Sequence, residues 1–161
     1  MEQERSISLL FGMTAAGVKT PLCVDVNGRL QIDVNYYESI FYKIKDSNVN
    51  VAVADGLDGR VIPVYLNGYN LYSATASLHT AGATNGTTDI QIRRRRDGAD
   101  VDMLSTKVTI ATTDYTASDG VVDTANDDLL TGDLIYVDVD AITGTAGKGL
   151  CVTIILRKPL S

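Results

Sequence analysis

The feature of this chain that most constrains its fold is a two-residue alternation of apolar and polar side chains, which returns along residues 39–157 between short clusters of Gly, Asn and Asp. Successive side chains of a β-strand point to opposite faces, so this period is typical of strands with one buried face. No stretch of the sequence carries a long apolar stripe at the i, i+3, i+4 spacing of a helix. The sequence therefore predicts an all-β fold rather than an α/β protein.

Eight segments carry the alternation, and they are rich in the β-branched residues that fit a pleated surface. They cover residues 39–45, 49–53, 60–66, 69–80, 87–95, 103–111, 134–140 and 150–157. Pairs such as Asp55-Gly56, Asp58-Gly59 and Asp97-Gly98 lie between them and suit chain reversals, because these residues tolerate positive φ angles. Eight strands with this spacing predict a jelly-roll-like β-sandwich. The best helical candidate is residues 121–130, with one or two turns.

The strongest local signal lies nearer the N-terminus, in residues 22–34. Apolar and polar residues alternate there on both sides of Asn27-Gly28, a pair that tolerates the φ angles of a type I′ turn, so we predict a β-hairpin. Two strands alone are marginally stable in water, and this hairpin must pack either on its own domain or on another molecule. We divide the chain into an N-terminal arm and hairpin, residues 1–35, which precede a jelly-roll β-sandwich domain, residues 36–161.

Charge and length exclude several classes of protein. The 161 residues carry a formal net charge of −6, whereas a nucleic-acid-binding protein needs a basic face to neutralise phosphates. No apolar run approaches the roughly 20 residues that cross a bilayer, so we expect neither nucleic acid nor membrane as a partner. The acidic start and the interrupted apolar run of residues 7–13 do not fit a signal peptide, and we expect a protein made and used without secretion.

The residue types that carry catalysis or bind metals are few and scattered. His79 is the only histidine, and a half-exposed position in the strand over residues 69–80 explains it. Cys23 and Cys151 lie far apart and are expected as small buried residues of strands rather than as a disulfide or zinc pair. The glycine-rich residues 143–149 lack the spacing of a phosphate-binding loop and are predicted to join two strands. The sequence thus predicts no catalytic residue and no cofactor.

Two charged segments leave alternatives open. One run of oxygen-bearing side chains could hold a calcium ion, but its spacing departs from that of an EF-hand loop, so we expect solvated carboxylates and no metal. Its members are Asp123, Asn126, Asp127, Asp128 and Asp133. Arg93–Arg96 could bind an anion, although the alternation of a strand places them on two faces. Asp97, Asp100 and Asp102 follow across a predicted turn, and we expect a solvated, charge-balanced hairpin end.

The second half of the chain resembles tailed-bacteriophage virion proteins with C-terminal jelly-roll domains. The segments that carry this resemblance lie within residues 60–159 and are TDIQI (88–92), MLSTKVTI (103–110), VDTANDD (122–128), TGDLIYVDVD (131–140), GLCVTI (149–154) and RKP (157–159). Such proteins include capsid decoration (cement) proteins, head fibres and some tail adhesins. The resemblance implies a protein that acts by binding and not by catalysis.

On this basis we expect a non-enzymatic structural protein that decorates and stabilises the capsid by binding the major capsid protein. It would lie on the capsid surface of the virion, form a homo-trimer and be made in the host cytoplasm. The expected capsid-contact residues are apolar side chains of the N-terminal arm and hairpin: Ile7, Leu9, Leu10, Phe11, Leu22, Val24, Val26, Leu30 and Ile32. Their burial at the contact would contribute about 1.5–3 kcal/mol for each large side chain.

The alternative is a head-fibre or tail adhesin that binds a host surface glycan. Six tyrosines could line a sugar-binding groove, because each ring is apolar and each hydroxyl polar, although packing in the core or at an interface is the more common outcome. They are Tyr36, Tyr37, Tyr42, Tyr65, Tyr69 and Tyr72.

Overall fold

The structure, a computed structural model, describes residues 11–13, 19–21 and 36–159. The chain divides into two compact units, Met1–Val34 and Asn35–Ser161. In the first unit, β1 (Phe11–Met13) and β2 (Lys19–Pro21) form an antiparallel pair. The predicted hairpin over residues 22–34 lies outside the described residues, and Phe11 is the only described member of the expected capsid-contact set. The other members lie outside them as well: Ile7, Leu9, Leu10, Leu22, Val24, Val26, Leu30 and Ile32.

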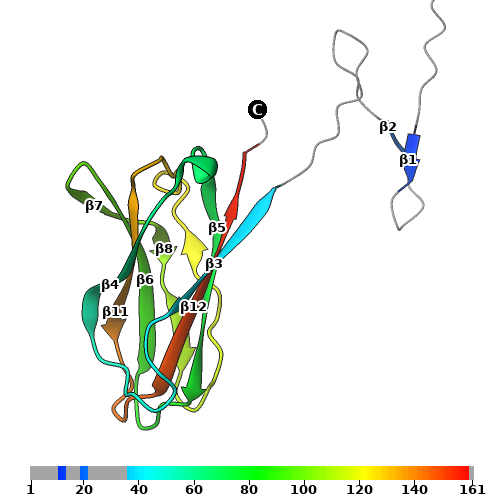
Figure 1. The fold of residues 1–161 in the computed structure, drawn as a ribbon. Helices are drawn as coiled ribbons and strands as arrows, with labels where there is room; N and C mark the ends of the chain where they lie inside the picture. The colour runs from blue at the N-terminus through cyan, green and yellow to red at the C-terminus, as the bar shows by residue number, and fades with distance from the viewer. Residues whose placement is uncertain (1–10, 14–18, 22–35, 160–161) are drawn as a thin grey trace, which may run out of the picture. The chain divides into compact units, whose positions relative to one another are not determined.

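The second unit is built from antiparallel β-sheets, which confirms the predicted all-β class (Figure 1). One sheet has the order β3 (Tyr37–Lys43), β12 (Lys148–Arg157), β5 (Asn70–Thr80). The other has the order β4 (Ala54–Val61), β11 (Leu134–Ala141), β6 (Thr87–Arg96), and both β7 (Ala99–Asp102) and β9 (Val108–Ala111) pair with β6. A short pair joins β8 (Leu104–Thr106) to β10 (Val121–Val122).

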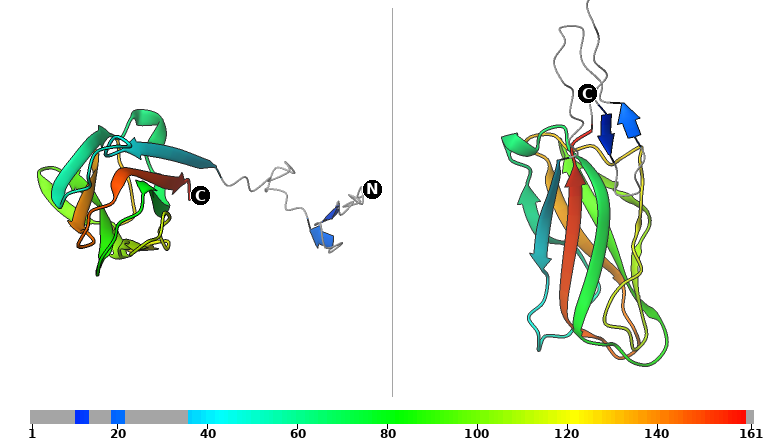
Figure 2. Two further views of the ribbon diagram at one scale, coloured as in Figure 1. Left: turned by 90° about the horizontal axis from the view of Figure 1, so that it is seen from below. Right: turned by 90° about the vertical axis from the view of Figure 1, so that its right-hand side faces the viewer.

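The two main sheets enclose one hydrophobic core (Figure 2). Alternate residues of the long strands face inward, for example the fully buried Ile90 and Ile92 of β6 and Val152 and Ile154 of β12. The alternation read from the sequence is thus the alternation between the core face and the outer face of each sheet. No helix in the described ranges is long and apolar enough to cross a bilayer.

The predictions for the long strands are confirmed. Those over residues 69–80, 87–95, 134–140 and 150–157 correspond to β5, β6, β11 and β12, and the one over 39–45 corresponds to β3 with a shift of two residues. Each of these strands buries one face, and its sequence therefore carries both the alternation and residues that fit a pleated surface.

Three strand predictions are wrong or incomplete. Residues 49–53 form no strand, although Val51 is buried and its N–H donates to the carbonyl oxygen of Gly147. Residues 60–66 end β4 and then, after Pro63, form the 3-10 turn η1 (Val64–Leu66). Residues 103–111 are divided into β8 and β9.

Strand β4 replaces two predicted turns, at Asp55-Gly56 and Asp58-Gly59. Gly56 and Asp58 do have the positive φ angles that were expected, +68° and +47°, but these angles produce irregularities in the pairing with β11 and do not reverse the chain. Strand β4 pairs only with β11, and an edge strand tolerates such irregularities.

The predicted helix over residues 121–130 is wrong. The segment begins with β10 and continues in turns whose backbone groups bond to other strands. The N–H of Leu129 donates to the carbonyl oxygen of Tyr69, and the carbonyl oxygen of Asp127 accepts from Leu71. Leu129 is fully buried while Leu130 is exposed, so Leu129 and these backbone bonds attach the end of the segment to the core.

Strand β6 pairs with β9 up to Ile90 and with β7 from Arg93 onward, and the side-chain amide of Gln91 bonds to the backbone between these two ladders. The Gln91 side chain donates to the carbonyl oxygen of Leu104 at 3.0 Å and accepts from the N–H groups of Leu104 and Ile92 at 3.1 Å and 2.9 Å. Gln91 is 3% exposed, so these backbone groups have lost water and depend on the amide.

We expect Gln91→Ala to lower the free energy of unfolding by about 2 kcal/mol, because it leaves buried backbone groups without partners. Urea denaturation followed by circular dichroism measures the change. The control is Thr106→Ala at an exposed position of β8, which should change stability by less than about 0.5 kcal/mol. Equal effects of the two substitutions would contradict this role of Gln91.

Candidate functional site

The four consecutive arginines lie at the end of β6, and Asp97 and Gly98 turn the chain into β7. Asp97 and Gly98 have φ angles of +51° and +81°, and Arg96 lies opposite Ala99 in the ladder. Positive φ at both residues of a two-residue loop is typical of a type I′ hairpin turn. The turn predicted at Asp97-Gly98 is confirmed.

Arg93 and Arg95 lie on the outer face of the sheet, where carboxylates pair with them. Arg95 forms two hydrogen bonds with Asp100, at 2.6 Å and 2.7 Å, and Arg93 approaches Asp100 at 3.3 Å and Asp138 at 3.1 Å. Both guanidinium groups lie over the ring of Tyr136, at 5.6 Å from Arg93 and 5.3 Å from Arg95. The hydrogen bond from Arg95 lowers the pKa of Asp100.

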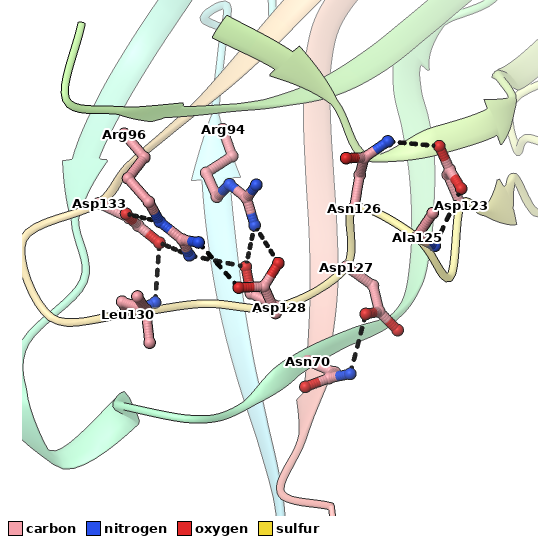
Figure 3. Close-up of polar contacts among 10 residues, drawn as sticks. All are labelled: Asn70, Arg94, Arg96, Asp123, Ala125, Asn126, Asp127, Asp128, Leu130 and Asp133. Atoms are coloured by element: carbon pink, nitrogen blue, oxygen red, sulfur yellow. Dashed lines mark hydrogen bonds and ion pairs between the residues drawn. The ribbon is translucent and has the colours of Figure 1, made fainter. Parts of the chain in front are cut away.

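Arg94 and Arg96 lie on the core side of β6 and pair with carboxylates of the segment that joins β10 to β11 (Figure 3). Arg96 donates to Asp133 at 2.8 Å and 2.7 Å and to Asp128 at 2.9 Å. Arg94, which is 6% exposed, donates to both the side chain and the carbonyl oxygen of Asp128. The N–H of Leu130 donates to Asp133 at 2.7 Å. We call Arg94, Arg96, Asp128 and Asp133 the arginine–aspartate network.

Burial and pairing compete to set the pKa of each of these carboxyls. For Asp133, burial raises the pKa, but the hydrogen bonds from Arg96 and Leu130 outweigh burial and lower it. Asp128 behaves in the same way, with Arg94 and Arg96 as its partners. For Asp138, burial prevails over the N–H of Gly56 and the charge of Arg93, and the pKa is raised.

The predicted balance of charge in the arginine run is confirmed, but the hairpin end is not solvated throughout, because Arg94 and Asp133 are buried, and its main partners were missed. Of the three aspartates expected to pair, only Asp100 forms ion pairs with the arginines in the described structure. Asp128 and Asp133 lie 32–37 residues further along the chain than Arg94 and Arg96, and no spacing rule relates residues so far apart. The one sequence signal for this pairing was that the same domain contains both an arginine run and an acidic run.

The acidic stretch offered as an alternative calcium site binds protein groups instead. Asp128 and Asp133 pair with arginines, as described above. Asp127 accepts a hydrogen bond from the side chain of Asn70 at 2.8 Å, and Asp123 accepts hydrogen bonds from the backbone of Ala125 and the side chain of Asn126. Within the residues that the structure describes, no three His, Cys, Asp or Glu side chains are grouped as metal ligands. A hollow of about 220 Å³ beside Arg96 and Asp133 is bordered by their mutually paired charges.

A different surface has exposed apolar side chains. On the outer face of the three-stranded sheet, Tyr37 and Phe41 of β3 are 48% and 55% exposed, and Tyr72 of β5 is 47% exposed. The rings of Tyr37 and Tyr72 meet edge to face at 5.2 Å, and the guanidinium of Arg157 lies 4.9 Å from the Tyr72 ring. We call Tyr37, Phe41, Tyr72 and Arg157 the aromatic face. Clustered exposed aromatic residues are typical of interaction surfaces.

The remaining candidates lie apart from both clusters. Of the six tyrosines considered for a groove, Tyr42 and Tyr69 are buried, which leaves four at the surface. His79 is exposed near the end of β5, and Cys151 is a free thiol on β12 that is half-buried and not fully buried as expected. Cys23 lies outside the described residues. The loop predicted over residues 143–149 does join two strands, but it covers residues 142–147, because Lys148 and Gly149 already belong to β12.

No known protein family matches this chain, and no curated protein sequence is significantly similar to it.

Proposed function

We propose that this chain is a non-enzymatic structural protein of a tailed-bacteriophage virion, where it decorates and stabilises the capsid by binding the major capsid protein. In this proposal residues 36–161 form a jelly-roll β-sandwich on the capsid surface, and residues 1–35 anchor it. The protein would be made in the host cytoplasm and act as a homo-trimer. The resemblance of residues 60–159 to virion proteins and the antiparallel sheets of the second unit support the proposal.

The single observation that carries the proposal is the division of the chain into two units at Val34 and Asn35. Residues 36–159, whose burial the structure describes, form a hydrophobic core of their own from β3 to β12. In this proposal the apolar side chains of residues 7–11 contact the capsid protein. Strand addition to a partner sheet is a common way in which such segments bind.

The chemistry of the β domain also fits a binding role. Its arginine run, the most concentrated positive charge in the sequence, is neutralised by aspartates of the same chain. The protein as a whole keeps a net charge of −6, and an acidic surface remains soluble and is repelled by packaged DNA.

The alternative function, a head-fibre or tail adhesin that binds a host glycan, has one specific observation in its favour. The aromatic face presents two exposed tyrosine rings beside the cationic Arg157, and sugar rings stack on such surfaces while their hydroxyls bond to polar groups. The same face would equally serve contact with protein, so this function remains the second candidate.

The test measures binding of the full-length chain to purified capsids that lack it. We expect Leu9→Asp/Leu10→Asp to weaken binding at least about 100-fold, because two buried leucines contribute about 3–6 kcal/mol together and each 1.4 kcal/mol is about tenfold in affinity. Val64→Asp, which changes a side chain 76% exposed in the β domain, is the matched control and should bind as the unmodified protein does.

A second pair of measurements separates the two functions. If the protein is an adhesin, Tyr37→Ala/Tyr72→Ala should abolish binding to host cells while Leu9→Asp/Leu10→Asp leaves it intact. Full capsid binding by the leucine variant would disprove the anchor, and failure of the unmodified chain to bind capsids would disprove decoration.

A further inference from the structure

The two edges of the three-stranded sheet differ in kind. Strand β3 pairs with β12 over seven residues without a shift in register, and in the described part of the chain no segment pairs with its other side. The far side of β5 is covered by residues 115–120, because Leu78 donates to Tyr115, Ala117 donates to Ala76, and Gly120 donates to Ala74. This segment lies beside β5 in Figure 2 (right). The sheet therefore ends in an open strand on one side and an irregular segment on the other.

The lysine-bearing end of the β3 edge and the segment beside β5 carry side chains of opposite charge. The β3 edge has Lys43 and Lys45, and the only acidic residue within β3, Glu38, lies near its other end. Lys43 pairs with Asp46, but both side chains are more than 60% exposed, and such pairs contribute little. The segment beside β5 carries Asp114 and Asp119, which are exposed and have no ion pair among the described residues.

Asp114 lies at the same height along the strands as the lysines. The N–H of Lys45 donates to the carbonyl oxygen of Leu150, which lies opposite Leu78 in the ladder. The N–H of Leu78 in turn donates to the carbonyl oxygen of Tyr115. Lys45 and Tyr115 therefore lie in one row across the sheet. Asp114 precedes Tyr115 directly. A rotation about an axis parallel to the strands preserves height, so it would bring the lysines of one copy to Asp114 of the next.

Exposed apolar side chains accompany the charges on both edges. Phe41 of β3 is 55% exposed, and Tyr115 and Val121 beside β5 are 58% and 55% exposed. Two copies of an acidic chain repel each other unless cations of one meet carboxylates of the other. The lysines and Asp114 provide such a contact next to an apolar one.

We infer that copies of this chain associate head to tail, with the β3 edge of one copy against residues 114–121 of the next. A contact between two different patches of the same chain is heterologous, and it closes into a ring when the rotation permits. The inference rests on the proposed function, since it names the surface through which the homo-trimer would form. The partner is a second copy, and the ring contains three.

The experiment measures the mass of the full-length protein by size-exclusion chromatography with light scattering. We expect three times the chain mass of 17.2 kDa for the unmodified protein. Lys43→Glu/Lys45→Glu and Asp114→Lys/Asp119→Lys should each weaken assembly at least tenfold and elute as monomers. A chain that carries all four substitutions should assemble again, because the charges are exchanged and remain complementary. Asp102→Lys, on the exposed surface of β7, is the control and should remain trimeric.

Several results would overturn the inference. These are a monomeric unmodified protein, unchanged assembly of either double variant, or failure of the fourfold variant to reassemble. All four substituted side chains are half-buried or exposed, and thermal melting confirms that each variant folds. Capsid binding in the same samples separates the two proposals. A trimer that does not bind capsids disproves decoration and leaves the interface standing. A monomer that binds capsids disproves the interface and leaves decoration standing.

Discussion

Asp133→Ala is expected to lower the free energy of unfolding by about 3–5 kcal/mol, the usual cost of removing one partner from a buried ion pair. The Asp133 side chain is 2% exposed and accepts two hydrogen bonds from Arg96 and one from the N–H of Leu130. Its removal leaves the guanidinium with only Asp128, whose side chain is 49% exposed. Urea denaturation at pH 7 measures the loss.

Two variants control this prediction. Asp133→Asn keeps the shape and one oxygen acceptor and should lose less stability than alanine, which separates charge from hydrogen bonding. Asp102→Ala removes an exposed aspartate without an ion pair among the described residues and should change stability by less than about 0.5 kcal/mol. A loss below about 1 kcal/mol for Asp133→Ala would show that the network contributes nothing beyond a surface pair.

The same network predicts how stability depends on pH. The pKa of Asp133 is lower in the folded protein than the ordinary value of about 3.9 for an unfolded chain. Its contribution is therefore complete above that ordinary value and is lost as the pH falls through the lower pKa of the folded state. The difference in stability between Asp133→Ala and the unmodified protein should accordingly shrink below pH about 4.

Ile154→Ala is the second large expected effect, a loss of about 2–5 kcal/mol. Ile154 is fully buried on β12, the central strand of its sheet, between Ile40 of β3 and Ala74 of β5. Alanine removes buried methyl and methylene groups and leaves a cavity, because both neighbouring strands are fixed by their ladders. Thermal and urea denaturation measure the change.

The neighbouring residue is the matched control. Ile155 has the same side chain on the same strand, but it points to the outer face and is only half-buried. We expect Ile155→Ala to cost less than about 1 kcal/mol, since no cavity forms on an outer face. Equal losses at Ile154 and Ile155 would contradict the assignment of the two faces.

The sequence alone determined the class of the fold and most of its long strands. The two-residue alternation in segments such as 87–95 and 150–157 reflects burial of one face, and burial is encoded by the residue types themselves. The turn at Asp97-Gly98 was predictable for a similar reason, because few residue pairs tolerate two positive φ angles in succession. Edge strand β4 was not predictable, since the same Asp and Gly residues serve turns and irregular edges alike.

Only the tertiary structure decided which charges meet. Arg96 is the last residue of β6, and Asp133 is the last residue before β11. The packing of the sheets brings these two chain positions together. The same packing placed Leu129 beside Tyr69 and made residues 121–130 a short strand followed by turns instead of a helix. Local preferences act over a few residues and are visible in the sequence, whereas contacts between distant residues depend on the path of the whole chain.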